Sequence, residues 1–122
     1  MSNILEYYPK MSERQFKSST GYSKAEFAAL CKDFEGLFFE IYKCNYQTYL
    51  DDRVMEKVKL PKLENCLFFV MYQLKNDLVY DSLGATFQMS GSTAHDNFKK
   101  YLGLLKQTLE KKKSIPNGTL RV

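Results

Sequence analysis

Apolar side chains recur along this chain at steps of three and four residues, which is the period of an amphipathic α-helix. The clearest helix is expected to begin after Ser23, because Ser23 and Glu26 have the spacing of a capping box. We expect it to continue to about residue 50. Its apolar stripe consists of Phe27, Leu30, Phe34, Leu37 and Ile41.

A second helix is expected after Pro61, a residue that suits the first turn of a helix. Nearly every position between residues 63 and 74 is apolar, and Lys75, Asn76 and Asp77 end the run. A helix that is hydrophobic on all sides is surrounded by other elements. This segment is therefore predicted to be the central core helix.

Residues 79–98 predict two helices joined by a tight turn. The first helix would end at Phe87, the turn would lie at Gln88 and Met89, and Ser90 would cap the second helix. Gly84 would permit a close approach of the next element. A small residue, a turn, an apolar plug and an N-cap in this order are typical of a helix-turn-helix.

The second helix of this pair is expected to run to Lys113. Its predicted apolar stripe is Phe98, Leu102, Leu105 and Leu109, whereas Lys99, Lys106 and Lys113 recur every seven residues on another side. Residues 114–122 have no period, which predicts a flexible C-terminal tail. The sequence thus predicts an all-α fold, with a single helical domain of about five helices over residues 1–113 that contains the helix-turn-helix.

Composition and charge indicate which class of binding partner to expect. The 122 residues are 44% hydrophobic, which suits one domain with one core. Residues 1–60 hold nine basic and nine acidic side chains, so the net charge of +4 comes from residues 61–122, with nine basic and five acidic. Six lysines and one acid lie in residues 98–113. Such a concentration favours a polyanionic partner, and a plain solvated helix face is the alternative.

Other kinds of chemistry find little support in the sequence. Cys31, Cys44 and Cys66 lack the close spacing of a metal site, so we expect reduced thiols, no metal and no cofactor. His95 has no suitable nucleophile and acid around it, so no catalytic residue is expected. No run of about 18 apolar residues occurs, and the opening residues are not those of a signal peptide. We expect a cytoplasmic protein without a membrane span.

Two stretches resemble the N-terminal helix-turn-helix domain of bacterial insertion-sequence transposases of the DDE type. The first is Phe16 together with residues 20–30 (TGYSKAEFAAL), similar to the family's opening TGLS…EF…L text. The second covers residues 67–105, where a buried helix is followed by the text VYDSLGATFQMSGSTA at residues 79–94. The likeness covers roughly residues 16–108. Three positions depart from the family's pattern. Gln88 stands where the family usually has the glycine of the turn, and the other two positions are Ala94 and Asn97.

This resemblance implies binding of double-stranded DNA, with the terminal repeats of a mobile element as the expected target. We expect the chain to lack the family's catalytic domain and therefore to be non-catalytic by itself. It is expected to act as a homodimer or together with a separately encoded catalytic subunit. The face of residues 27–41 is one candidate for the dimer surface. The start of the second helix would enter the major groove. The residues expected to contact DNA are Ser90, Ser92, Thr93, His95, Asp96, Lys99, Lys100 and Lys106.

Two other hypotheses stay open at this point. The same fold serves small transcriptional regulators that bind promoter DNA. Alternatively, the chain is a protein-interaction module whose last helix is a docking surface. The stretch expected to contact bases contains no arginine, although arginine to guanine is the commonest specific contact.

Overall fold

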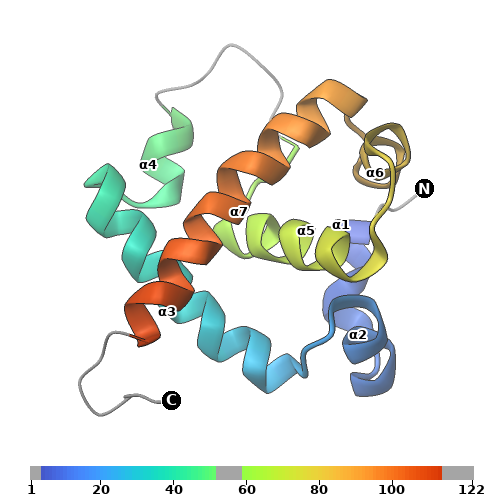
Figure 1. Ribbon diagram of the computed structural model, residues 1–122, viewed down its shortest axis with the longest axis horizontal. Helices are drawn as coiled ribbons and strands as arrows, with labels where there is room; N and C mark the ends of the chain where they lie inside the picture. The colour runs from blue at the N-terminus through green and yellow to red at the C-terminus, as the bar shows by residue number, and fades with distance from the viewer. Residues whose placement is uncertain (1–3, 52–58, 114–122) are drawn as a thin grey trace.

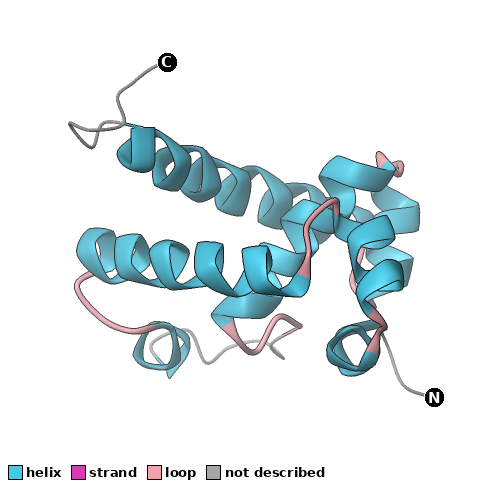
Figure 2. Cartoon of the chain, turned by 90° about the horizontal axis from the view of Figure 1, so that it is seen from below, coloured by secondary structure: helices cyan, strands magenta, loops and turns pink. Residues whose placement is uncertain are grey.

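The computed structural model describes residues 4–51 and 59–113, and all regular elements in these residues are helices (Figures 1 and 2). This confirms the prediction of a single all-α helical domain. The elements in chain order are α1 (Ile4–Tyr7), a 3₁₀ helix η1 (Tyr8–Lys10), α2 (Glu13–Thr20), α3 (Lys24–Tyr42), α4 (Tyr46–Asp51), α5 (Leu63–Asn76), α6 (Tyr80–Phe87) and α7 (Gly91–Lys113).

Helix α5 forms the centre of the core, as its sequence predicts. Leu67, Phe68, Phe69 and Val70 are completely buried, and α5 contacts α2, α3 and α7. In Figure 1, α7 runs across α5 from the turn after α6 toward α3. Burial of each such large side chain stabilises the fold by roughly 1.5–3 kcal/mol relative to exposure. Leu74 near the end of α5 is 55% exposed, so the all-round burial ends before that residue.

The N-terminal 20 residues contain helices that the apolar pattern did not predict. Ser12 caps α2 by accepting a hydrogen bond from Gln15 N–H at 3.1 Å, and Gly21 ends it with φ of 84°. The ring of Tyr8 stacks on Phe68 with centroids 4.0 Å apart. This stacking joins the start of the chain to the central helix.

The prediction of one helix from Ser23 to about residue 50 was wrong. The capping box at Ser23 and Glu26 is present, but α3 ends at Tyr42 because Lys43 adopts a left-handed conformation with φ of 63°. Asn45 then caps α4, since its side-chain oxygen accepts a hydrogen bond from Thr48 N–H at 2.9 Å. The break turns α4 back, so that Tyr46 and Tyr49 pack edge-on against Phe38.

Two predicted apolar stripes also need correction. Phe27, Leu30, Phe34 and Leu37 are buried in the chain's own core, so this part of α3 is not a free dimer surface, and Ile41 is 42% exposed. On α7, the buried side is rotated relative to the predicted stripe, and Leu109 is 36% exposed. The buried residues of α7 are Ala94, Tyr101, Leu104, Leu105 and Thr108.

None of the described helices combines the length and the apolar character that a bilayer span requires. The predicted tail at residues 114–122 lies outside the described residues.

Candidate nucleic-acid interface

The start of α7 is held against α6 by a close backbone contact at Gly84. A Cβ added to Gly84 would lie 2.4 Å from the carbonyl oxygen of Met89 and 2.9 Å from that of Ser90. Met89 N–H also donates to the carbonyl oxygen of Gly84 at 2.8 Å. Glycine is needed here because any side chain would push the turn away from α6.

Gln88 makes the turn between the two helices in a left-handed conformation, with φ of 62°. This is the position where the resembled family has glycine, and the backbone keeps the turn geometry without it, at a local cost. Asn97 donates from Nδ2 to the Met89 sulfur at 3.5 Å, and Ala94 is fully buried. The turn and the first turns of α7 therefore form one packed unit with α6.

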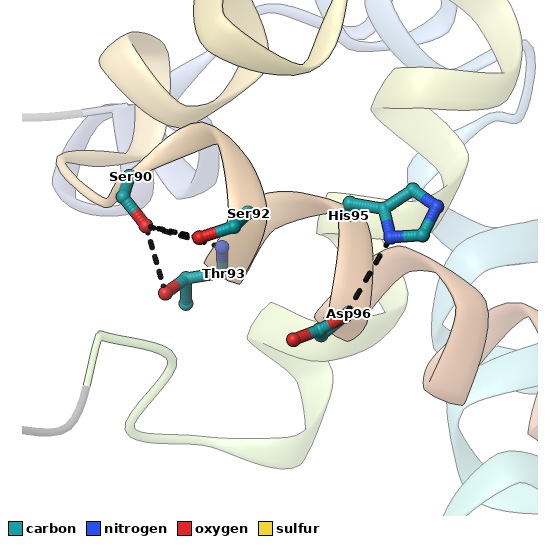
Figure 3. Close-up of polar contacts among 5 residues, drawn as sticks. All are labelled: Ser90, Ser92, Thr93, His95 and Asp96. Carbon is teal, nitrogen blue, oxygen red and sulfur yellow. Dashed lines mark hydrogen bonds and ion pairs between the residues drawn. The ribbon is translucent and has the colours of Figure 1, made fainter.

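The hydroxyl groups at the start of α7 form a local hydrogen-bond cluster (Figure 3). Ser90 Oγ accepts from Thr93 N–H at 3.1 Å and donates to Thr93 Oγ1 at 2.9 Å, and Ser92 Oγ lies 3.3 Å from Ser90 Oγ. Ser90 thus serves as the N-cap that the sequence predicts. Ser92 and Thr93 are exposed.

His95 and Asp96 lie one turn further along α7 (Figure 3). His95 Nδ1 is 3.5 Å from Asp96 Oδ1, and the Asp96 side chain is 83% exposed. The His95 ring meets the Tyr80 ring edge-on, with centroids 4.7 Å apart. His95 is therefore oriented by α6, whereas Asp96 projects into solvent.

The structure divides the predicted lysines into two groups. Lys99 and Lys106 are exposed, and their spacing from Ser92 and Asp96 places all four on the outward side of α7. Lys100 lies on the flank, where its ammonium donates to the Tyr49 hydroxyl and is 4.4 Å from the centre of the Tyr49 ring. Lys111 also lies on a flank and pairs with Glu40. The four lysines of α7 whose side chains the structure describes thus do not form one continuous surface.

Asp81 is a charged residue of the site that sequence reasoning missed. A Cβ added to Gly91 would lie only 2.0 Å from Asp81 Oδ1, so the carboxylate of Asp81 is placed at the amino end of α7. A carboxylate is favourable there because it complements the helix dipole. Gly91 at the first position of a helix, ten residues after an aspartate, was the only sequence signal of this contact.

The three cysteines are free thiols, with Cys66 buried and Cys31 and Cys44 half-buried. Burial raises the pKa of Cys66 to about 12. In residues 4–51 and 59–113, no three histidine, cysteine or acidic side chains are grouped so that they could hold a metal ion.

Comparisons of the chain with protein-family models, with curated proteins and with solved structures gave no match.

Proposed function

We propose that α6 and α7 act as a helix-turn-helix that binds double-stranded DNA, with the outward side of the first turns of α7 in the major groove. One observation carries this proposal. Ser92, Asp96 and Lys99 are exposed on one side of α7, while Ala94 on the opposite side is completely buried. The start of the helix is thus firmly held and freely accessible, which is what recognition of base edges requires.

The dimensions of this outward side suit a DNA groove. A helix with its side chains is about 10–12 Å across, which fits the major-groove width of about 12 Å. With a rise of about 1.5 Å per residue, Ser92 and Lys99 lie about 10 Å apart along the axis of α7. Lys106 lies about 10 Å beyond Lys99. Lys106 is therefore suited to a phosphate at the edge of the groove rather than to a base.

The side chains on this surface have separate roles in the proposal. Asp96 accepts a hydrogen bond from an exocyclic amine such as cytosine N4, and Ser92 donates to a base or a phosphate. Lys99 and Lys106 neutralise phosphates, which contributes affinity without sequence preference. Ser90 and Lys100, which were also predicted to contact DNA, have structural partners, so the proposal assigns them no contact. The contacts predicted for Thr93 and His95 stay predictions.

The likeness to insertion-sequence transposases makes the ends of a mobile element the first duplexes to test. Promoter DNA from the same genome is the alternative target, and a footprint there would favour a transcriptional regulator. In the transposase case, the expected partner is a separately encoded catalytic subunit.

Neighbouring lysines on α7 provide a matched experiment. Binding of a labelled duplex of about 25 base pairs is followed by fluorescence anisotropy between about 50 and 200 mM salt. Lys99→Gln and Lys106→Gln should each reduce the salt slope by about 0.9, because each removes one phosphate contact. Lys100→Gln removes the same charge but should leave the slope almost unchanged, since its ammonium contacts Tyr49. Asp96→Ala should alter base preference.

Two outcomes would overturn the proposal. One is the absence of binding to any duplex at low salt, which would leave the protein-interaction module as the remaining hypothesis. The other is an effect of Lys100→Gln as large as that of Lys99→Gln, because α7 would then not present the side we assign to DNA.

A further inference from the structure

A cavity of about 610 Å³ lies on the domain, lined by residues of three separate segments. These are the residues of α1 and η1, the loop that leads into α5 together with the first turn of α5, and the end of α6. Its volume falls within the range of about 300–1,000 Å³ that is usual for small-molecule sites. The cavity is separate from the outward side of α7, so a ligand could occupy it whether or not α7 binds DNA.

One wall of the cavity is fixed by hydrogen bonds that are buried or partly buried. The Tyr8 hydroxyl donates to Glu64 Oε2 at 2.9 Å and accepts from Asn65 Nδ2 at 2.9 Å. Asn65 Oδ1 in turn accepts from Lys62 N–H at 3.0 Å. Burial and the nearby Glu64 carboxylate both raise the pKa of Tyr8, so its hydroxyl remains a donor to Glu64. The wall is preorganised, and one carboxylate oxygen of Glu64 is already occupied.

Among the residues that the structure describes, three lysines at the cavity have no acidic partner. Lys10, Lys59 and Lys62 line it, and no carboxylate of a described residue lies within 4.0 Å of their ammonium groups. Two acids, Glu6 and Glu64, also line it. Over the described lining residues the balance is one positive charge, which favours an anionic group among the lysines.

The cavity also offers apolar surface beside these charges. Leu5, Pro9 and Pro61 contribute to the lining, and neither proline has a backbone N–H to satisfy. An inorganic ion would leave this surface in contact with water. A molecule that combines an anionic group with a flat apolar part satisfies both surfaces.

We propose that this cavity binds a small amphipathic organic anion, whose phosphate, sulfonate or carboxylate group faces Lys10, Lys59 and Lys62 and whose apolar part packs against Leu5, Pro9 and Pro61. The ammonium groups supply charge-assisted hydrogen bonds to the anion. Gln88, which makes the turn before α7, lines the same cavity. A bound ligand therefore contacts the end of α6 as well as the start of the chain.

Two dyes that share a ring system test this proposal on the full chain. Anilinonaphthalene sulfonate carries the anionic group, whereas N-phenylnaphthylamine is its neutral counterpart. We expect the sulfonate to bind with one-to-one stoichiometry and much more tightly than the neutral dye. In a proton–nitrogen correlation spectrum, its addition should shift the amide signals of Asn65 and Gln88, which line the cavity.

Lysine variants then show whether the lysines of this cavity bind the charged group of the dye. Lys10→Gln, Lys59→Gln and Lys62→Gln should each weaken binding of the sulfonate by about two- to fivefold, as expected for partly exposed charge pairs. Lys32→Gln removes the same charge from an exposed position of α3 and should leave the affinity unchanged. The proposal fails if the sulfonate does not bind, if Lys32→Gln weakens it equally, or if the neutral dye binds as tightly.

Discussion

Replacing Gly84 by alanine tests whether the turn into α7 depends on the close approach of two backbones. The added Cβ would meet the Met89 carbonyl oxygen at 2.4 Å and the Ser90 backbone at 2.9 Å. These are backbone atoms, so no side chain can rotate out of the way. The turn must instead move away from α6, which also weakens the bond from Met89 N–H to the Gly84 carbonyl oxygen.

The net effect combines three contributions. Overpacking of this kind costs about 1–3 kcal/mol, and a weakened hydrogen bond costs about 1 kcal/mol. Alanine regains about 1 kcal/mol of helix propensity relative to glycine. Gly84→Ala is therefore expected to lower the free energy of unfolding by about 1–3 kcal/mol.

Two other helical glycines are matched controls for this change. A Cβ added to Gly36 in α3 or to Gly103 in α7 would meet nothing within 4 Å. Only the propensity gain remains there, so each alanine variant should be more stable than the parent chain by up to about 1 kcal/mol.

Urea unfolding followed by circular dichroism measures all three variants. With an m-value of about 1–3 kcal/mol per molar, the midpoint of Gly84→Ala should fall by roughly 1 M, while those of the controls should rise. A midpoint for Gly84→Ala that is unchanged or raised, as for Gly36→Ala, would refute the close contact between α6 and the turn.

Three further predictions concern other parts of the fold. Lys43→Gly should raise the free energy of unfolding by about 0.5–1 kcal/mol, because glycine adopts the left-handed conformation at the end of α3 without strain. A thermal unfolding midpoint lower than that of the parent chain would contradict this prediction. Cys66 should react with a thiol reagent at about pH 8 only as the chain unfolds, because burial raises its pKa to about 12. Half-buried Cys44 should react first. Equal reaction rates of the two thiols, measured by mass spectrometry, would show that Cys66 is accessible. Glu26 has a pKa below its ordinary value of 4.5, because its carboxylate accepts a hydrogen bond from Ser23 N–H. The charged carboxylate therefore stabilises the fold above pH 4.5, and this stabilisation is lost as the pH falls through the lowered pKa. The stability advantage of the parent chain over Glu26→Gln should therefore shrink between about pH 6 and pH 3, and an advantage independent of pH would contradict the assignment.

Local rules allowed parts of the fold to be predicted from the sequence. The capping box at Ser23 depends on residues only three positions apart, and the burial of residues 66–71 follows from an uninterrupted apolar run. The need for a small residue at Gly84 and a turn at Gln88 also follows from neighbouring residues. In each case, the information lies within one or two helical turns of the chain.

Features that depend on distant residues could not be predicted in this way. The partner of Lys100 is Tyr49, which lies 51 residues earlier and is brought near only because α3 breaks at Lys43. The residues next to a lysine in the sequence do not show whether its ammonium group will contact another part of the fold or stay in solvent. The same holds for Asp81, whose position at the start of α7 depends on the angle between two helices.

The outward side of α7 carries equal numbers of positive and negative charges among its described residues. Lys99 and Lys106 face solvent there together with Asp96 and Glu110. Two phosphate contacts imply a loss of affinity of only about twelvefold between about 50 and 200 mM salt, against a thousandfold or more for binders with six or more contacts. If α7 binds DNA as proposed, such a surface binds random DNA only weakly, and its residence time on a duplex depends on the contacts with the base edges.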